Sequence, residues 1–83
     1  MKTITIYSTP TCGFCQQLKA FLKENAIPFT DHNVVEDEAA REKMRKITDG
    51  GSSVPVIVFN QGQTDEEIQV GYDPEKVQKA LGL

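Results

Sequence analysis

Two cysteines, Cys12 and Cys15, lie three positions apart in the stretch YSTPTCGFCQQL, where an apolar strand pattern gives way to a helical one. Thiols at this spacing can bind a metal ion, form a structural disulfide or exchange electrons through a reversible disulfide. A zinc site needs four ligands, and beyond this pair the chain offers only His32 and carboxylates. A staple across so short a loop restricts the unfolded chain little. A redox pair is therefore the favoured interpretation.

The position of each cysteine along the predicted helix distinguishes the two thiols. Cys12 stands directly before the helix, where unpaired backbone N–H groups and the positive end of the helix dipole favour a thiolate. Cys15 lies about one turn inside the helix. Because the thiolate is the reactive form, we predict that Cys12 is the nucleophile. Cys15 then resolves the mixed disulfide and leaves a Cys12–Cys15 redox disulfide.

The elements that must position this pair follow from hydrophobic periodicity and from turn residues. The pattern predicts, in order, a central strand 2–7, a helix 14–26, a more polar edge strand 29–35, a helix 37–47, a buried strand 55–59, a hairpin turn 60–63, a returning strand 67–70 and a last helix that opens at Asp73–Pro74. On the first helix, the buried face is predicted to hold Phe14, Leu18 and Phe21, with Cys15 and Leu22 beside them.

This order of elements predicts a small α/β sandwich. The first strand, helix and second strand form a right-handed parallel crossover, and the last two strands form an antiparallel hairpin that joins the same sheet. We predict one four-stranded mixed sheet flanked by three helices, in a single domain that covers residues 1–83.

Composition narrows the classes of partner. The chain has nine basic and twelve acidic residues, for a net charge of −3, and no cluster of Lys and Arg, so nucleic acid is not expected as a partner. No apolar run approaches the roughly 20 residues that span a bilayer, so no membrane partner is expected either. The first ten residues lack the apolar segment of a secretory signal. We expect a cytoplasmic, monomeric protein.

Three segments together resemble the glutaredoxin family of the thioredoxin fold. IYSTPTCGFC is similar to the first strand and C-x-x-C active site of that family, REKMRKITDGGSSVPVIVF to its second helix and Val-Pro loop, and VGYDPEKVQKAL to its turn into the last helix. The resemblance covers nearly the whole chain. It implies a thioredoxin-like (glutaredoxin) fold and a dithiol thiol–disulfide oxidoreductase that acts in electron transport and cell redox homeostasis. Its clients are protein disulfides, or mixed disulfides with a low-molecular-weight thiol, and it has no tightly bound cofactor.

The resemblance also implies the remaining site residues. In the family, a cis peptide before a proline faces the cysteines, and the backbone of the preceding residue pairs with the substrate as a strand would. These roles fall on Val54 and Pro55. Gly71, Tyr72 and Asp73 match the turn that holds the carboxylate of glutathione in glutathione-using members.

Departures from the family pattern leave the reductant open. Thr9 stands where many members have Lys, Val70 replaces the first glycine of a Gly-Gly pair, and Ser52 and Ser53 replace basic or amide residues. The cations that could substitute for the missing partners of glutathione are Lys43, Arg45 and Lys46. The reductant is then glutathione, another small thiol as in mycoredoxins, or thioredoxin reductase. The last possibility applies to the glutaredoxin-like hydrogen donors of ribonucleotide reductase, which the VGYDPEK turn also resembles.

A second function class follows from the two residues between the cysteines. Gly13 and Phe14 match the Cys-Gly-Phe-Ser of monothiol glutaredoxins. Those proteins hold a 2Fe–2S cluster between two subunits, with one Cys from each subunit and two glutathiones. Thiolates are good cluster ligands, so cluster binding and transfer by a dimer is the alternative to disulfide exchange.

Overall fold

The computed structural model of the chain describes residues 3–51 and 54–82. Its elements follow in the order β1 (Ile4–Ser8), α1 (Gly13–Glu24), β2 (Thr30–Asn33), α2 (Glu38–Ile47), β3 (Val56–Phe59), β4 (Glu67–Val70) and α3 (Pro74–Leu81). Lys2, where the first predicted strand begins, and Ser52 and Ser53, where two of the departures from the family pattern lie, are outside the described residues. Within these residues, no helix combines the length and the apolar character that crossing a bilayer requires.

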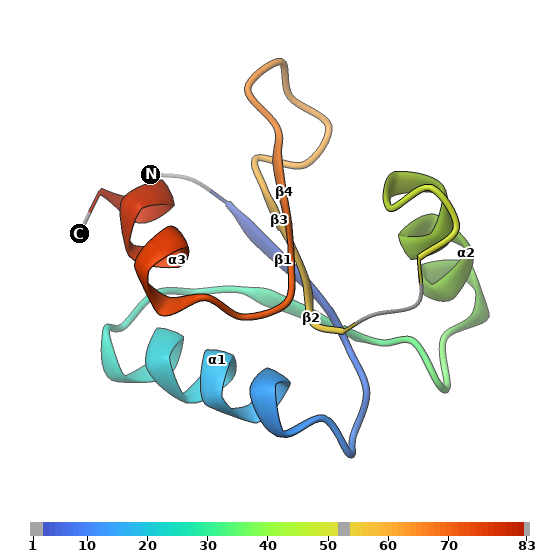
Figure 1. The fold of residues 1–83 in the computed structure, drawn as a ribbon, viewed down its shortest axis with the longest axis horizontal. Helices are drawn as coiled ribbons and strands as arrows, with labels where there is room; N and C mark the ends of the chain where they lie inside the picture. The colour runs from blue at the N-terminus through green and yellow to red at the C-terminus, as the bar shows by residue number, and fades with distance from the viewer. Residues whose placement is uncertain (1–2, 52–53, 83) are drawn as a thin grey trace.

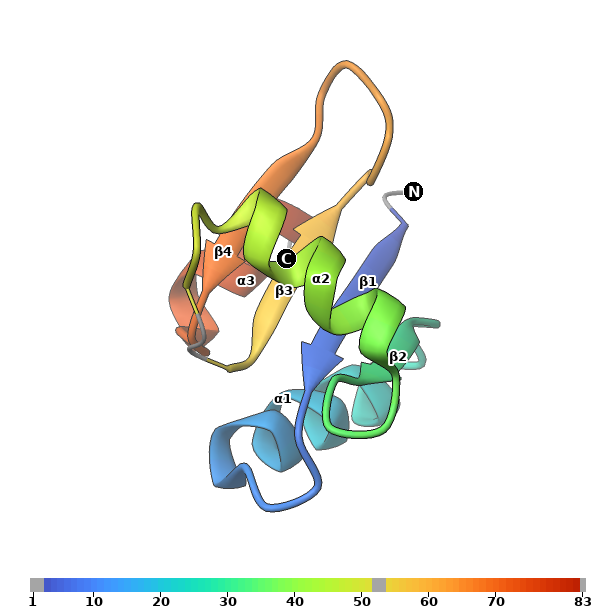
Figure 2. The ribbon, with the colours of Figure 1, turned by 90° about the vertical axis from the view of Figure 1, so that its right-hand side faces the viewer.

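The four strands form one mixed sheet in the order β2-β1-β3-β4. β1 is parallel to β2 and antiparallel to β3, and β3 is antiparallel to β4. Helices α1 and α3 cover one face of the sheet and α2 covers the other (Figure 1; Figure 2). The predicted sheet of four strands with three helices is confirmed, as are the central place of β1 and the edge place of β2.

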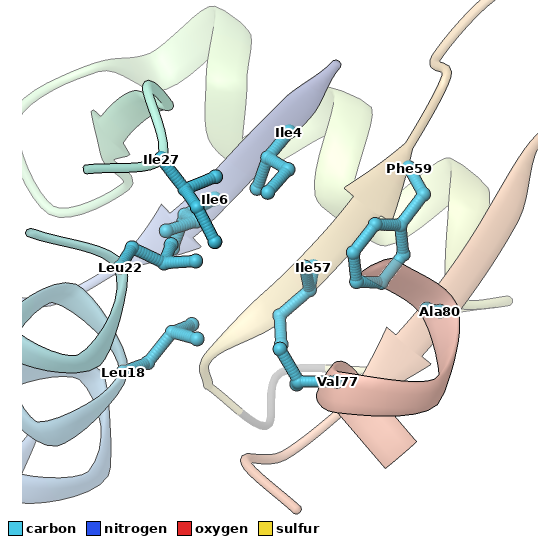
Figure 3. Close-up of a cluster of buried hydrophobic side chains, with 9 residues drawn as sticks. All are labelled: Ile4, Ile6, Leu18, Leu22, Ile27, Ile57, Phe59, Val77 and Ala80. Atoms are coloured by element: carbon cyan, nitrogen blue, oxygen red, sulfur yellow. The ribbon is translucent and has the colours of Figure 1, made fainter. Parts of the chain in front are cut away.

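Each face of the sheet has its own apolar cluster, because successive strand residues point to opposite faces. Ile4 and Ile6 of β1 point to the face covered by α1 and α3, and Tyr7 points to the face covered by α2. Figure 3 shows how the first cluster fills the space between the sheet, α1 and α3. Its buried members are Ile4, Ile6, Leu18, Leu22, Ile27, Ile57, Phe59, Val77 and Ala80. The second cluster consists of Tyr7, Val34, Ala40, Met44, Val56 and Val58.

Several element ends differ from the sequence prediction. Helix α1 ends at Glu24 and not at residue 26, because Asn25 caps it and Ala26 adopts a left-handed φ of 55°. Strand β2 is shorter than the predicted 29–35, since only Thr30–Asn33 pair with β1. The predicted turn at 60–63 is present, with the Gln63 N–H donating to the Asn60 carbonyl at 3.0 Å. The connection then continues to residue 66 and protrudes beyond the sheet (Figure 1).

The prediction for Phe14 was wrong. Its side chain is 61% exposed, whereas the buried face of α1 consists of Cys15, Leu18 and Leu22. Phe14 lies in the first turn of the helix, next to the cysteines. The chain therefore exposes an aromatic side chain to solvent at a position that lies between the two cysteines in the sequence.

Candidate thiol–disulfide site

Three segments that are distant in sequence meet at one end of the sheet. β1 ends at Ser8, and the chain leads from there to Cys12. Tyr7 pairs with Val56 in the antiparallel register, so the start of β3, directly after Pro55, lies at the same end. Val56 in turn pairs with Val70, which brings the end of β4 and Gly71 there as well. The sheet thus gathers the three predicted parts of the site.

The two cysteines form a disulfide in this structure, with their Cα atoms 5.2 Å apart. Cys12 is half-buried, whereas Cys15 is completely buried on the inner face of α1. An attacking thiol has to reach a sulfur in line with the S–S bond, so access decides which sulfur is met first. Of the two cysteines, Cys12 is therefore the one that an incoming thiol can approach.

Cys12 is the N-cap residue of α1. It has extended backbone angles, and its Sγ accepts a hydrogen bond from the Cys15 N–H at 3.1 Å. The Cys12 carbonyl accepts the first helical bond, from the Gln16 N–H at 3.2 Å. The first turn of α1 contains no acidic residue to oppose a negative charge. A thiolate at this position would therefore be stabilised by a backbone donor and by the helix dipole.

Val54 and Pro55 lie where the chain enters β3. The peptide bond between them is cis, as the resemblance implied. Pro55 is buried, and its carbonyl accepts a hydrogen bond from the Gly71 N–H at 2.7 Å. Val54 is half-buried and packs against the apolar cluster on the α2 face. The bond from Gly71 to Pro55 joins two of the predicted site segments directly.

The turn from Gly71 to Asp73 connects β4 to α3. Gly71 has a φ of 85°, in the left-handed region that side chains disfavour. Asp73 caps α3 and accepts hydrogen bonds from the backbone N–H groups of Glu75 and Lys76, at 3.1 and 3.4 Å. A pocket of about 350 Å³ opens beside this turn; it is lined by Ile68, Gln69, Val70, Gly71, Tyr72, Asp73 and Lys76.

Tyr72 stays neutral in this turn at physiological pH. Burial against the core cluster raises the pKa of its phenol, and the nearby negative charge of Glu24 raises it further. The neutral hydroxyl can both donate and accept a hydrogen bond at the edge of the pocket.

The cation in this pocket is one that the sequence analysis missed. The predicted cations Lys43, Arg45 and Lys46 belong to α2, on the other face of the sheet. The cation that lines the pocket is Lys76. The sequence did contain a signal for Lys76. Asp73 and Pro74 mark the start of a helix, and the residue three positions after an N-cap lies in the first turn, close to the cap.

His32 lies apart from the cysteines. Its ring stacks on Tyr7, with ring centroids 5.4 Å apart, and both residues face the α2 side of the sheet. Among residues 3–51 and 54–82, no group of three or more His, Cys, Asp or Glu side chains is arranged to hold a metal ion. A shared cluster would take its other ligands from outside the single chain, and that alternative stays a prediction.

Comparison with known proteins identifies the family. Residues 4–63 match the family model described as Glutaredoxin. The chain belongs to the glutaredoxin family. As a glutaredoxin-family protein, it is 41% identical over 78 residues to an uncharacterized glutaredoxin-like 8.6 kDa protein in the rubredoxin operon of Clostridium pasteurianum. That match covers 94% of this chain and 96% of the relative.

Solved structures agree with this assignment of the glutaredoxin-family chain. A mutant of the thioredoxin-like protein BC3987 superposes with a TM-score of 0.84 at 33% identity, over 99% of this chain and 97% of the other. The glutaredoxin-like protein NrdH-redoxin from Escherichia coli superposes with a TM-score of 0.74 at 25% identity, over 93% and 92% of the two chains. The predicted family and thioredoxin-like fold are confirmed, and the chain is a glutaredoxin-like redox protein with a C-x-x-C pair.

Proposed function

We propose that the protein is a dithiol thiol–disulfide oxidoreductase. The Cys12 thiolate attacks a client disulfide, forms a mixed disulfide and expels one client sulfur as a thiolate. The Cys15 thiol then loses its proton and attacks Cys12 Sγ, which expels the second client sulfur. The client gains two electrons and takes up protons from solvent, while the protein is left with the Cys12–Cys15 disulfide.

One observation supports this division of roles above the others. Cys12 is half-buried at the start of α1 and its sulfur accepts a backbone hydrogen bond, whereas Cys15 is completely buried. The accessible cysteine is thus also the one whose thiolate is stabilised. Cys15, one helical turn further on, is within reach of Cys12 but shielded from other thiols.

The residues around the pair supply the substrate contacts in this proposal. The backbone of Val54 pairs with an extended client segment, as an added strand pairs with a sheet edge. The turn at Gly71, Tyr72 and Asp73 holds the carboxylate of a small thiol. Since the Glu75 and Lys76 N–H groups already bind Asp73, the donors for that carboxylate are the amides of Tyr72 and Asp73 and the ammonium of Lys76.

The likeness to NrdH-redoxin favours a second candidate for the electron source. NrdH-redoxin from Escherichia coli has a thioredoxin-like activity profile. In this candidate function, the protein is reduced by thioredoxin reductase and donates electrons to ribonucleotide reductase. The chemistry at Cys12 and Cys15 is the same, and only the source of electrons differs.

Serine variants of the two cysteines test the proposal. In Cys12→Ser we expect the loss of both protein-disulfide reduction and removal of glutathione from a glutathionylated peptide, because no nucleophile remains. Cys15→Ser should lose the first reaction and, where glutathione is the reductant, retain the second. Each reaction is followed by NADPH oxidation, once with glutathione and its reductase and once with thioredoxin reductase.

The electron source is read from the unmodified protein in the same assays. Turnover with thioredoxin reductase alone favours the second candidate, and turnover with glutathione favours the first. Circular dichroism of each variant controls for folding. Disulfide reduction by a folded Cys12→Ser protein would contradict the proposal.

A further inference from the structure

A polar network beneath the cysteines links three elements. The Ser8 hydroxyl donates a hydrogen bond to Asp31 Oδ1 at 2.6 Å. The Lys19 ammonium donates to the other oxygen of the same carboxylate, Asp31 Oδ2, at 3.0 Å. Ser8 belongs to β1, Lys19 to α1 and Asp31 to β2, so one carboxylate joins all three elements.

This network differs from the other charge pairs of the described residues. The distance from Lys19 Nζ to Asp31 Oδ2 is 3.0 Å. In the other ion pairs of the described residues, the nitrogen and oxygen atoms are 3.8 or 4.0 Å apart. The Lys19 and Asp31 side chains are only 18% and 29% exposed, and Ser8 is 2% exposed. Charges that are partly removed from water are screened less, so they act over a longer distance than surface charges.

The position of the network relates it to the redox pair. Ser8 is the last residue of β1 before the chain leaves for Cys12. Lys19 follows Cys15 by four positions on α1, and residues at that spacing lie on the same side of a helix. Asp31 pairs with Ile6 in the sheet and therefore faces α1 as Ile6 does. The three side chains thus lie between α1 and the sheet, about one helical turn below Cys15.

We propose that Ser8, Lys19 and Asp31 form a charge-balanced clamp that sets the reduction potential of the Cys12–Cys15 pair. The inference rests on the proposed redox function. The three residues are positioning residues, because they act through the start of α1 and through the charge they place about one helical turn from Cys15. None of them takes part in the exchange of sulfur bonds.

Because the two charges balance, removing one or the other should shift the reduction potential in opposite directions. Reduction of the disulfide creates a negative thiolate at Cys12, so a nearby positive charge favours the reduced form and a negative charge opposes it. Asp31→Asn leaves the Lys19 charge without its partner and should make the pair more oxidising. Lys19→Gln leaves the Asp31 carboxylate without its partner and should make the pair more reducing. The double variant restores the balance.

The test is an equilibrium titration of each purified variant with reduced and oxidised dithiothreitol at pH 7. One dithiothreitol dithiol delivers two electrons to the protein disulfide and becomes the cyclic disulfide, and the reduced fraction is counted by alkylation and mass spectrometry. Each single substitution should change the equilibrium constant by at least about threefold, in opposite directions, which corresponds to about 14 mV. The double variant should lie within about twofold of the unmodified protein.

Matched controls separate charge from structure. Lys23→Gln removes an exposed charge one turn further along α1 and should leave the potential unchanged, and Lys19→Arg should preserve it. Shifts of both single variants in the same direction, or no shift in either, would overturn the proposal. This readout needs no enzymatic turnover, so it stays informative if the protein fails the activity assays above. Should Asp31→Asn not fold, the comparison of Lys19→Gln with Lys19→Arg decides the sign on its own.

Discussion

At the scale of single residues, the environment that favours a thiolate and the access to an incoming partner coincide at Cys12. Cys12 has the helix-start environment that favours a thiolate, and Cys15 is buried one turn away. Phe14, between them, is 61% exposed, so it contributes little to the core. Lys76 lines the neighbouring pocket, whereas the three cations predicted from the sequence belong to α2.

Lys76→Gln tests the role proposed for that pocket. In the glutathione-coupled assay, we expect KM for glutathione to rise about threefold to tenfold with little change in kcat, because a charge-assisted contact with a carboxylate is lost. Lys46→Gln, an exposed cation on the opposite face of the sheet, is the control and should leave KM unchanged. Equal values of KM for the two variants would exclude Lys76 from the thiol site.

At the scale of elements, each helix begins at a side chain that binds the first backbone N–H groups. Cys12, Asp37 and Asp73 are the N-caps of α1, α2 and α3. Two of these caps are the acidic residues usual at such positions, whereas the cap of α1 is a thiol. Among the helices that the structure describes, α1 therefore begins at the side chain for which we propose a redox role.

Replacing the cap of α2 measures what an ordinary cap contributes in this fold. The Asp37 carboxylate accepts a hydrogen bond from the Ala40 N–H at 3.0 Å. We expect Asp37→Ala to lower the free energy of unfolding by about 1 kcal/mol, and Asp37→Asn to lose less than half of that because the amide oxygen can still accept. Urea denaturation at pH 7 provides the measurement. Equal losses in both variants would assign the effect to charge and not to capping.

At the scale of the whole molecule, the sheet and the two apolar clusters support a site that lies at one end. The cluster shared by α1 and α3 contains Leu18, which is fully buried one helical turn from Cys15. A domain of 83 residues has a small core, so each large buried side chain contributes a substantial part of its stability.

Leu18→Ala should therefore lower the free energy of unfolding by about 2 to 5 kcal/mol, through lost burial and the cavity that remains. Ile68→Ala on β4 is the control, because Ile68 is 37% exposed and its truncation should cost less than about 1 kcal/mol. Guanidinium denaturation of the oxidised proteins compares the two. A loss at Ile68 as large as that at Leu18 would mean that the edge strand, and not this cluster, limits stability.

Much of this architecture could be predicted from the sequence, because it depends on local patterns. Alternating Ile4 and Ile6 indicated β1, and Asp73 followed by Pro74 marked the start of α3. The Cys12–Cys15 spacing at a strand-to-helix junction indicated the redox pair. Each of these signals lies within a few neighbouring residues, where strand alternation and helix capping act.

The features that sequence analysis missed depend on contacts between distant segments. The exposure of Phe14 follows from how α1 sits on the sheet, since helical periodicity alone placed this residue with the buried face. The clamp joins Ser8 to Asp31, 23 positions later, and its geometry depends on the register of β1 with β2. No local pattern contains that information.

The gathering of the site at one end of the sheet has an evolutionary consequence. The loop before Cys12, the entry to β3 and the turn after β4 all lie outside the strands that they connect. Under the proposed function, mutations in these three segments alter which partner or thiol is recognised without breaking a ladder hydrogen bond. A lineage that keeps the proposed function can thus exchange one electron source for another while the scaffold stays the same, because function depends on the site and not on the fold.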